Sequence, residues 1–147
     1  MSVWQPFLGA LKNRLGSNGE VFLSGGIYDV AFTLAGTSSY VLNHSEAVKR
    51  VLRALIRADQ FCKDSPEEAR NLLTDAFKIS AADLKELWPA YRFDVALEQG
   101  LLLALEDESQ WAIKNRLTGS QDAPNYWNLL YLDALEAVAP AKVTVIH

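Results

Sequence analysis

The segment from residue 43 to residue 62 constrains the fold of this 147-residue chain more than any other. Asn43 is a favourable N-cap for a helix, and Glu46 follows three positions later. Apolar residues then recur at helical spacing and form one stripe, which consists of Val48, Val51, Leu52, Leu55 and Cys62. The pattern predicts a long amphipathic helix with one apolar side.

Capping residues mark the starts of other helices. Ser65 and Pro66 combine a capping serine with a proline at the first helical position, and Ser80 with Asp83 marks another start. A glycine after Leu15 ends the first helix. The sequence therefore predicts a short helix from Pro6 to about residue 15, helices that begin after Ser65 and after Ser80, and helices over about 97–116 and 126–137.

Few segments carry the signals of strands. Val30, Phe32 and Leu34 alternate with smaller residues, and 21–23 is a short apolar run before two glycines. Residues 89–94 are expected to be extended, and 143–146 to form a terminal strand or extended tail. The expected fold class is therefore α/β and helix-rich, in a single domain over 1–147, with a strand-containing segment at 1–42 and a mainly helical part at 43–147.

The composition is that of an ordinary soluble globular domain, with half the residues apolar and 22% charged. The net charge of −4 comes without a long block of either sign, which disfavours a nucleic-acid partner. No stretch approaches the roughly 18 apolar residues that a membrane span requires. The residues before Lys12 lack the positive start and apolar run of a signal peptide, so we expect the chain as written to stay in the cytoplasm.

The chain offers few groups for catalysis or metal binding. His44 precedes a predicted helix and His147 is terminal, so neither is well placed to act as a base. Cys62 lies on the apolar stripe, which favours a structural thiol over a reactive one, and a single cysteine excludes paired-cysteine metal sites. We therefore expect no enzyme activity, no metal and no cofactor.

Charged residues gather at two places. Lys49, Arg53 and Arg57 recur every four positions and Arg50 adjoins them, so one helix side carries a basic stripe. We favour a solvated outer surface for this stripe over an anion or nucleic-acid patch. The acidic run 106–108 is also expected to face solvent, since consecutive helical residues point in different directions.

Aromatic residues form two groups. Trp4, Tyr28 and Phe32 lie near predicted strand ends, where side chains often line a cleft, although core packing is the favoured role for Phe32. A second group is predicted to tie the extended segment to the last helix, and it consists of Trp88, Tyr91, Phe93, Tyr126 and Trp127.

Several stretches, in order, resemble the later part of the substrate-binding proteins of ABC importers, in the group that handles nitrate, sulfonates, taurine and thiamine precursors. The order and spacing of the stretches carry the resemblance more than any one motif, and together they cover nearly the whole chain. The stretches are Val3-Trp4-Gln5-Pro6-Phe7, 21–25, 28–32, 46–55, 65–69, 101–115, 124–135, Pro140 and 143–146.

The resemblance implies the C-terminal portion of a type II periplasmic-binding-protein fold. In that family two α/β lobes close over a small molecule, and the closed complex docks on a membrane permease. The family's first strands and most of its second lobe have no counterpart here. The resemblance implies four cleft residues, namely Trp4, Gln5, Tyr28 and Phe32, with Gln5 standing where the family has an acidic residue.

Two functions follow as expectations. The first is a solute-binding component, or a portion of one, which serves an ABC permease and is periplasmic by resemblance. The second is a free-standing binding protein from a truncated gene that no longer serves transport. Both predict a homo-oligomer, most simply a strand-exchanged dimer, because incomplete sheet edges and an uncovered apolar side would otherwise meet water. An enzyme of the same superfamily makes a thiamine pyrimidine with a cysteine-rich motif, and that motif is absent here.

Overall fold

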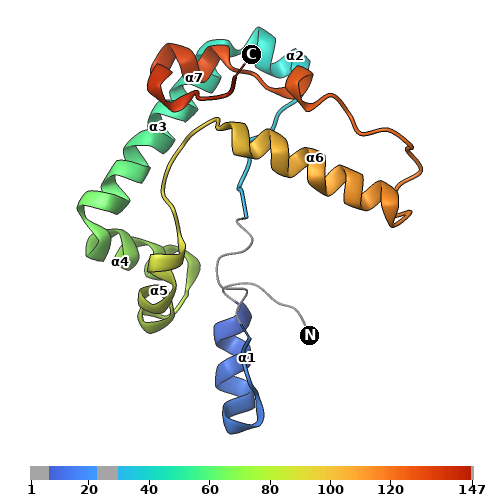
Figure 1. Ribbon diagram of the computed structural model, residues 1–147. Helices are drawn as coiled ribbons and strands as arrows, with labels where there is room; N and C mark the ends of the chain where they lie inside the picture. Colours follow the sequence, from blue (N-terminus) through green and yellow to red (C-terminus); the bar gives the residue numbers. More distant parts are fainter. Residues whose placement is uncertain (1–6, 23–29, 147) are drawn as a thin grey trace. The chain divides into compact units, whose positions relative to one another are not determined.

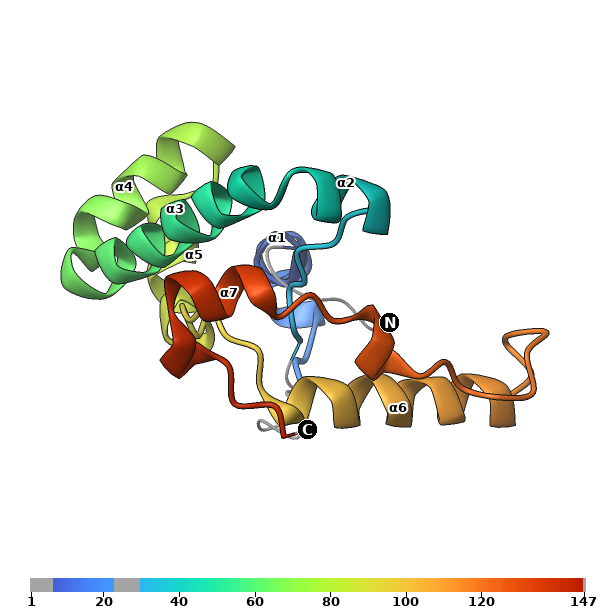
Figure 2. The same cartoon turned by 90° about the horizontal axis from the view of Figure 1, so that it is seen from above.

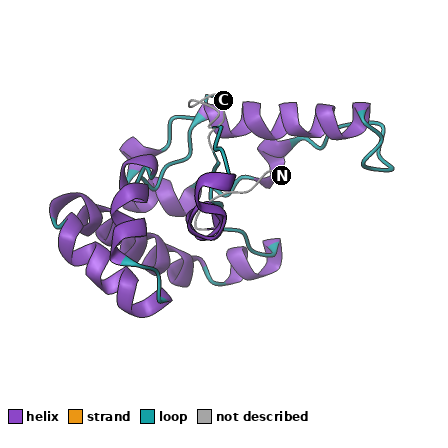
Figure 3. Cartoon of the chain, turned by 90° about the horizontal axis from the view of Figure 1, so that it is seen from below, coloured by secondary structure: helices purple, strands orange, loops and turns teal. Residues whose placement is uncertain are grey.

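The computed structural model describes residues 7–22 and 30–146, and this part of the chain consists of helices and loops (Figures 1 and 3). The prediction of a helix-rich chain is therefore confirmed. The helices, with η for 3₁₀ turns, are α1 (Phe7–Leu15), η1 (Gly16–Asn18), α2 (Ser38–Asn43), α3 (Ser45–Asp64), α4 (Pro66–Phe77), α5 (Ala81–Leu87), η2 (Trp88–Ala90), α6 (Gln99–Lys114), η3 (Tyr126–Leu129), α7 (Asp133–Val138) and η4 (Pro140–Lys142).

The expected strands do not form a sheet in the described residues. Residues 30–37 are a loop, so the strand predicted over Val30–Leu34 is wrong, because no described segment pairs with it. Val21 and Phe22 also lie in a loop, whereas Leu23, the last residue of that expected strand, falls outside the described residues. The extended segment predicted at 89–94 begins as the turn η2 and continues as a loop.

The C-terminal tail makes the one β-type pairing of the described residues. Leu97 and Val143 form a parallel bridge. The amide of Leu97 donates to the carbonyl of Lys142 at 2.8 Å, and the amide of Thr144 donates to the carbonyl of Leu97 at 2.9 Å. The predicted terminal strand is thus reduced to a single bridge at its first residue.

The chain divides into two compact units, residues 1–30 with 58–93 and residues 31–57 with 94–147. In the first unit α4 packs against α5, and the buried side chains are those of Ala69, Leu84 and Leu87. A Lys12–Glu86 ion pair of 3.0 Å links α1 to α5. The organisation as one domain over 1–147 stays a prediction.

Local signals explain the helices of the first unit. Gly16 has a φ of +53°, a conformation that glycine adopts without strain, and it ends α1 where predicted. Pro66 begins α4 at the predicted position, although the Ser65 side chain makes no capping hydrogen bond. Ser80 caps α5 as predicted, since its Oγ accepts from the amide of Asp83 at 3.0 Å.

The second unit is built around α6 and α7. Figure 2 shows η3 beside α6, and the hydroxyls of Ser109 on α6 and Tyr126 on η3 are hydrogen-bonded. The helix predicted over 126–137 divides into η3 and α7, because Leu130 has an extended backbone between them. The buried side chains of this unit are those of Leu102, Ala134, Leu135 and Val145.

The central helix begins later than predicted. Asn43 is the last residue of the separate helix α2, and α3 begins at Ser45, so the prediction of Asn43 as the N-cap is wrong. The Thr37 side chain caps α2, by accepting from the amide of Tyr40 at 3.3 Å. Glu46 pairs with Lys49 within α3. The segment predicted to begin one long helix thus contains the end of α2 and, after His44, the start of α3.

The apolar stripe of α3 is only partly covered. None of the 20 residues of α3 is buried. Val51 is 45% exposed and Leu55 is 40% exposed, although both lie on the predicted apolar side. An amphipathic helix gains most of its stability in a protein from packing that side against other residues. Val48, Leu52 and Cys62 are half-buried, so the apolar side of α3 has less cover than its sequence pattern implies.

Candidate functional site

Phe32 is the one predicted cleft residue whose surroundings the structure describes. Trp4, Gln5 and Tyr28 lie outside the described residues. The Phe32 side chain is 87% exposed. The prediction that Phe32 packs into a core is therefore wrong for this chain. Val30 and Leu34 on either side are also exposed. A row of alternating apolar side chains therefore meets solvent along this loop.

The backbone of the same loop makes few of the hydrogen bonds that the structure describes. Within the described part of the chain, residues 30–36 make no backbone hydrogen bond to another described residue. Amides and carbonyls in this state resemble those of an edge strand, which pair readily with another strand. The loop thus combines a strand-like side-chain pattern with backbone groups that pair with no other described residue.

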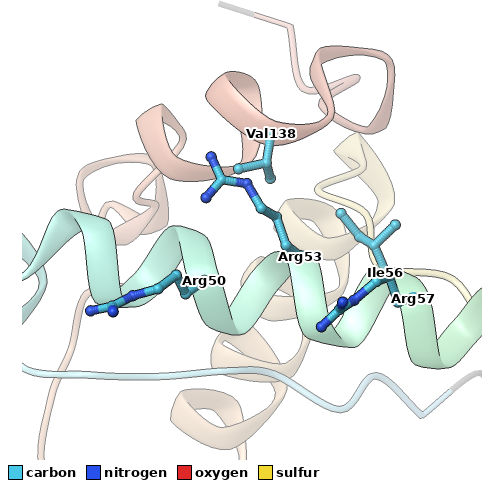
Figure 4. Close-up of a pocket in the computed structure, with 5 residues that line it drawn as sticks. All are labelled: Arg50, Arg53, Ile56, Arg57 and Val138. Carbon is cyan, nitrogen blue, oxygen red and sulfur yellow. The ribbon is translucent and has the colours of Figure 1, made fainter.

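A groove lies in the second unit, between α3 and the end of α7. It has a volume of about 530 Å³ and is lined by Arg50, Arg53, Ile56, Arg57 and Val138. Figure 4 shows the Arg53 side chain directed toward Val138, whereas Arg50 and Arg57 extend along α3. The predicted basic stripe therefore borders a groove. The sequence did not indicate Val138, because it lies 81 positions beyond Arg57.

Some of the basic side chains around this groove have polar partners and others do not. Lys49 Nζ donates to Glu46 Oε1 at 2.8 Å, and this contact, with the positive charges of Lys49, Arg53 and Arg50, lowers the pKa of Glu46. Arg50 Nε donates to the carbonyl of Glu46 at 3.3 Å. Among the described residues, Arg53 and Arg57 have no hydrogen-bond or ion-pair partner. The Glu46 carboxylate beside the stripe thus already has a partner in Lys49.

A smaller groove of about 320 Å³ lies at the start of α7. It joins aromatic rings to carboxylates, which is a combination suited to cations. Its lining residues are Trp127, Leu130, Tyr131, Leu132, Asp133 and Glu136.

Part of the second aromatic group forms within the first unit. The rings of Trp88 and Phe93 lie 4.6 Å apart, and those of Tyr91 and Phe93 lie 6.1 Å apart. The Arg70 guanidinium lies 5.5 Å from the centroid of the Trp88 ring, within reach of a cation–π contact. The other two predicted members, Tyr126 and Trp127, belong to the second unit.

His44 and Cys62, the residues considered above for catalysis, each lie near a helical residue three or four positions earlier. His44 stacks on Tyr40 at 4.4 Å, and its Nδ1 lies 3.1 Å from the carbonyl of Tyr40. Cys62 is a free, half-buried thiol, and burial together with the nearby Asp59 raises its pKa. In the described residues no three histidine, cysteine or acidic side chains gather as metal ligands would.

No helix among the described residues has the length and apolar character to cross a membrane. Comparison of the chain with family models, curated proteins and solved structures gives no match.

Proposed function

We propose that this chain is the C-terminal portion of a solute-binding protein of an ABC-type importer, with a partial type II periplasmic-binding-protein fold. It would provide one wall of a cleft for a small molecule such as a sulfonate, nitrate or a thiamine precursor. The ordered resemblance of nearly the whole chain to that family supports the proposal, and so does the helix-rich architecture. Binding of this kind needs no catalytic group.

The partly exposed apolar side of α3 is the observation that carries the proposal. Exposure of Val51 and Leu55 on a 20-residue amphipathic helix implies a missing partner surface. In a two-lobed binding protein, further chain would supply that surface. The family resemblance of residues 46–55, which lie in this helix, agrees with such a place in a larger fold.

The loop at 30–36 supports the same conclusion from the backbone. Its amides and carbonyls make no backbone hydrogen bond to another described residue, and Val30, Phe32 and Leu34 are exposed. Both features are expected of a strand whose neighbouring strands are absent. The resemblance assigns residues 28–32 to strands that cross between the two lobes. Missing strands from the rest of the fold would convert this loop into part of a sheet.

The cleft would hold its ligand by shape and weak polar contacts. Trp4, Tyr28 and Phe32 offer flat aromatic surfaces, and the Gln5 amide offers a neutral donor and acceptor in place of a charge. A neutral group at this position suits a ligand whose charge is met elsewhere in the cleft. Closure of the two lobes would then present a surface to the permease.

The first test is to determine the DNA sequence upstream of the Met1 codon. The proposal expects an open frame that encodes the rest of a two-lobed protein and a signal peptide. The longer protein should bind a sulfonate, nitrate or a thiamine precursor in calorimetry. Phe32→Ala should weaken that binding about tenfold, because an aromatic contact is lost. Phe77→Ala, at an exposed phenylalanine of α4, is the matched control.

A second candidate function is a free-standing homo-oligomer that binds a partner or ligand without transport. The same exposed side chains of α3 and residues 30–34 favour it, because a second copy could cover them. A stop codon and ribosome-binding site directly upstream of Met1 would select this alternative. A stable monomer in light scattering, at high concentration, would count against it.

A further inference from the structure

The groove between α3 and α7 has two kinds of lining, guanidinium groups and aliphatic side chains. Successive helical residues are rotated by about 100°, so Arg50 and Arg57 lie almost in line on α3 and Arg53 lies next to them. Ile56 follows around the helix, and Val138 closes the groove from α7. The lining therefore passes from guanidinium groups to aliphatic side chains over a short distance.

The guanidinium groups on the polar side have unused binding capacity. Arg53 and Arg57 have no ion-pair or hydrogen-bond partner in the described part of the chain, and Glu46 is already paired with Lys49. An arginine presents two parallel N–H groups that match two oxygens of a phosphate or carboxylate. Arg53 and Arg57 thus form a local positive charge on a chain whose net charge is −4.

We infer that this groove binds an organic phosphate, with the phosphate group on Arg53 and Arg57 and the apolar part of the ligand on Ile56 and Val138. Arg50, whose Nε is held by the Glu46 carbonyl, would add a further positive charge at the end of the groove. A volume of about 530 Å³ accommodates a small organic molecule. The site shares no residue with the cleft of the proposed function and does not depend on it.

The test uses the purified chain in titration calorimetry with two probes, inorganic phosphate and phenyl phosphate. Phenyl phosphate should bind more tightly, because only its ring reaches Ile56 and Val138. Equal affinities for the two probes would reject the organic part of the proposal and leave free phosphate as the ligand. No binding of either probe would overturn the proposal completely.

Substitutions separate the two halves of the groove. Arg53→Gln and Arg57→Gln should each weaken both probes about tenfold or more, because each removes a charge-assisted hydrogen-bond donor. Val138→Ala should weaken phenyl phosphate and leave inorganic phosphate unchanged. Arg14→Gln, at an exposed arginine of α1, removes the same charge outside the groove and should have no effect.

Two further measurements keep the outcome clear. Far-UV circular dichroism checks the fold of each variant, and Arg53→Lys, which keeps the charge, replaces Arg53→Gln if that variant does not fold. Arg53→Lys should weaken both probes less than the loss of charge does, because a lysine lacks the planar fork. An equal loss in Arg14→Gln, or retention of a single-stranded oligonucleotide without any binding of phenyl phosphate, would overturn the proposal.

Discussion

Leu97 and Val143 form a parallel bridge that joins the residues before α6 to the C-terminal tail. The Lys142 side chain strengthens the same junction through an ion pair with Asp94. The tail also contributes Val145 to the small core of the second unit. Since this unit buries few side chains, its stability should depend strongly on the tail.

Removing one backbone donor from the tail tests this dependence. Thr144→Pro deletes the amide that donates to the Leu97 carbonyl, and we expect a loss of about 1 kcal/mol or more in the free energy of unfolding. Thr144→Ala keeps the amide and is the matched control. Thermal unfolding by circular dichroism measures both. Equal stability of the two variants would show that the bridge contributes nothing.

The two serines that precede α4 and α5 should differ in how much they stabilise the protein. Ser80 accepts a capping hydrogen bond from Asp83, so Ser80→Ala should destabilise the protein by about 0.5–2 kcal/mol. The Ser65 side chain makes no such bond before α4, and Ser65→Ala should cost clearly less. Urea unfolding of the two variants gives the comparison. A larger loss for Ser65→Ala would contradict the capping geometry.

The exposed Val51 and Leu55 on the apolar side of α3 predict self-association of the isolated chain. Leu55→Glu places a charge on this side and should shift the mass measured by light scattering toward that of the monomer. Gln110→Glu adds the same charge at an exposed position of α6 and should leave the mass unchanged. A wild-type chain that stays monomeric at high concentration would refute the prediction.

The thiol of Cys62 should react slowly at neutral pH. Burial and the nearby Asp59 carboxylate both disfavour the thiolate and raise the pKa, so the reactive fraction is smaller than that of an ordinary thiol. The rate of reaction with a disulfide reagent should therefore rise only above the usual thiol pKa. Asp59→Asn removes one of the two causes and should move the inflection to lower pH. An inflection at or below the ordinary value would contradict the surroundings seen for Cys62.

Local sequence signals determined where most helices form. Pro66 and Ser80 set the starts of α4 and α5, and Gly16 ends α1, because caps and turns depend on residues only a few positions apart. The same kind of local signal was ambiguous at Asn43. Asn43 ends α2 instead of capping α3, and the sequence pattern did not separate these two helices.

The basic stripe of α3 was visible in the sequence because its members recur with the period of a helix. Its position beside Val138 was not, since α7 lies far along the chain and only the packing of the second unit brings the two together. The bridge from Leu97 to Val143 and the hydrogen bond from Ser109 to Tyr126 have the same character. Local spacing fixes helices and the sides of helices, whereas contacts between distant segments depend on which apolar surfaces pack together, and this is decided only in the tertiary structure.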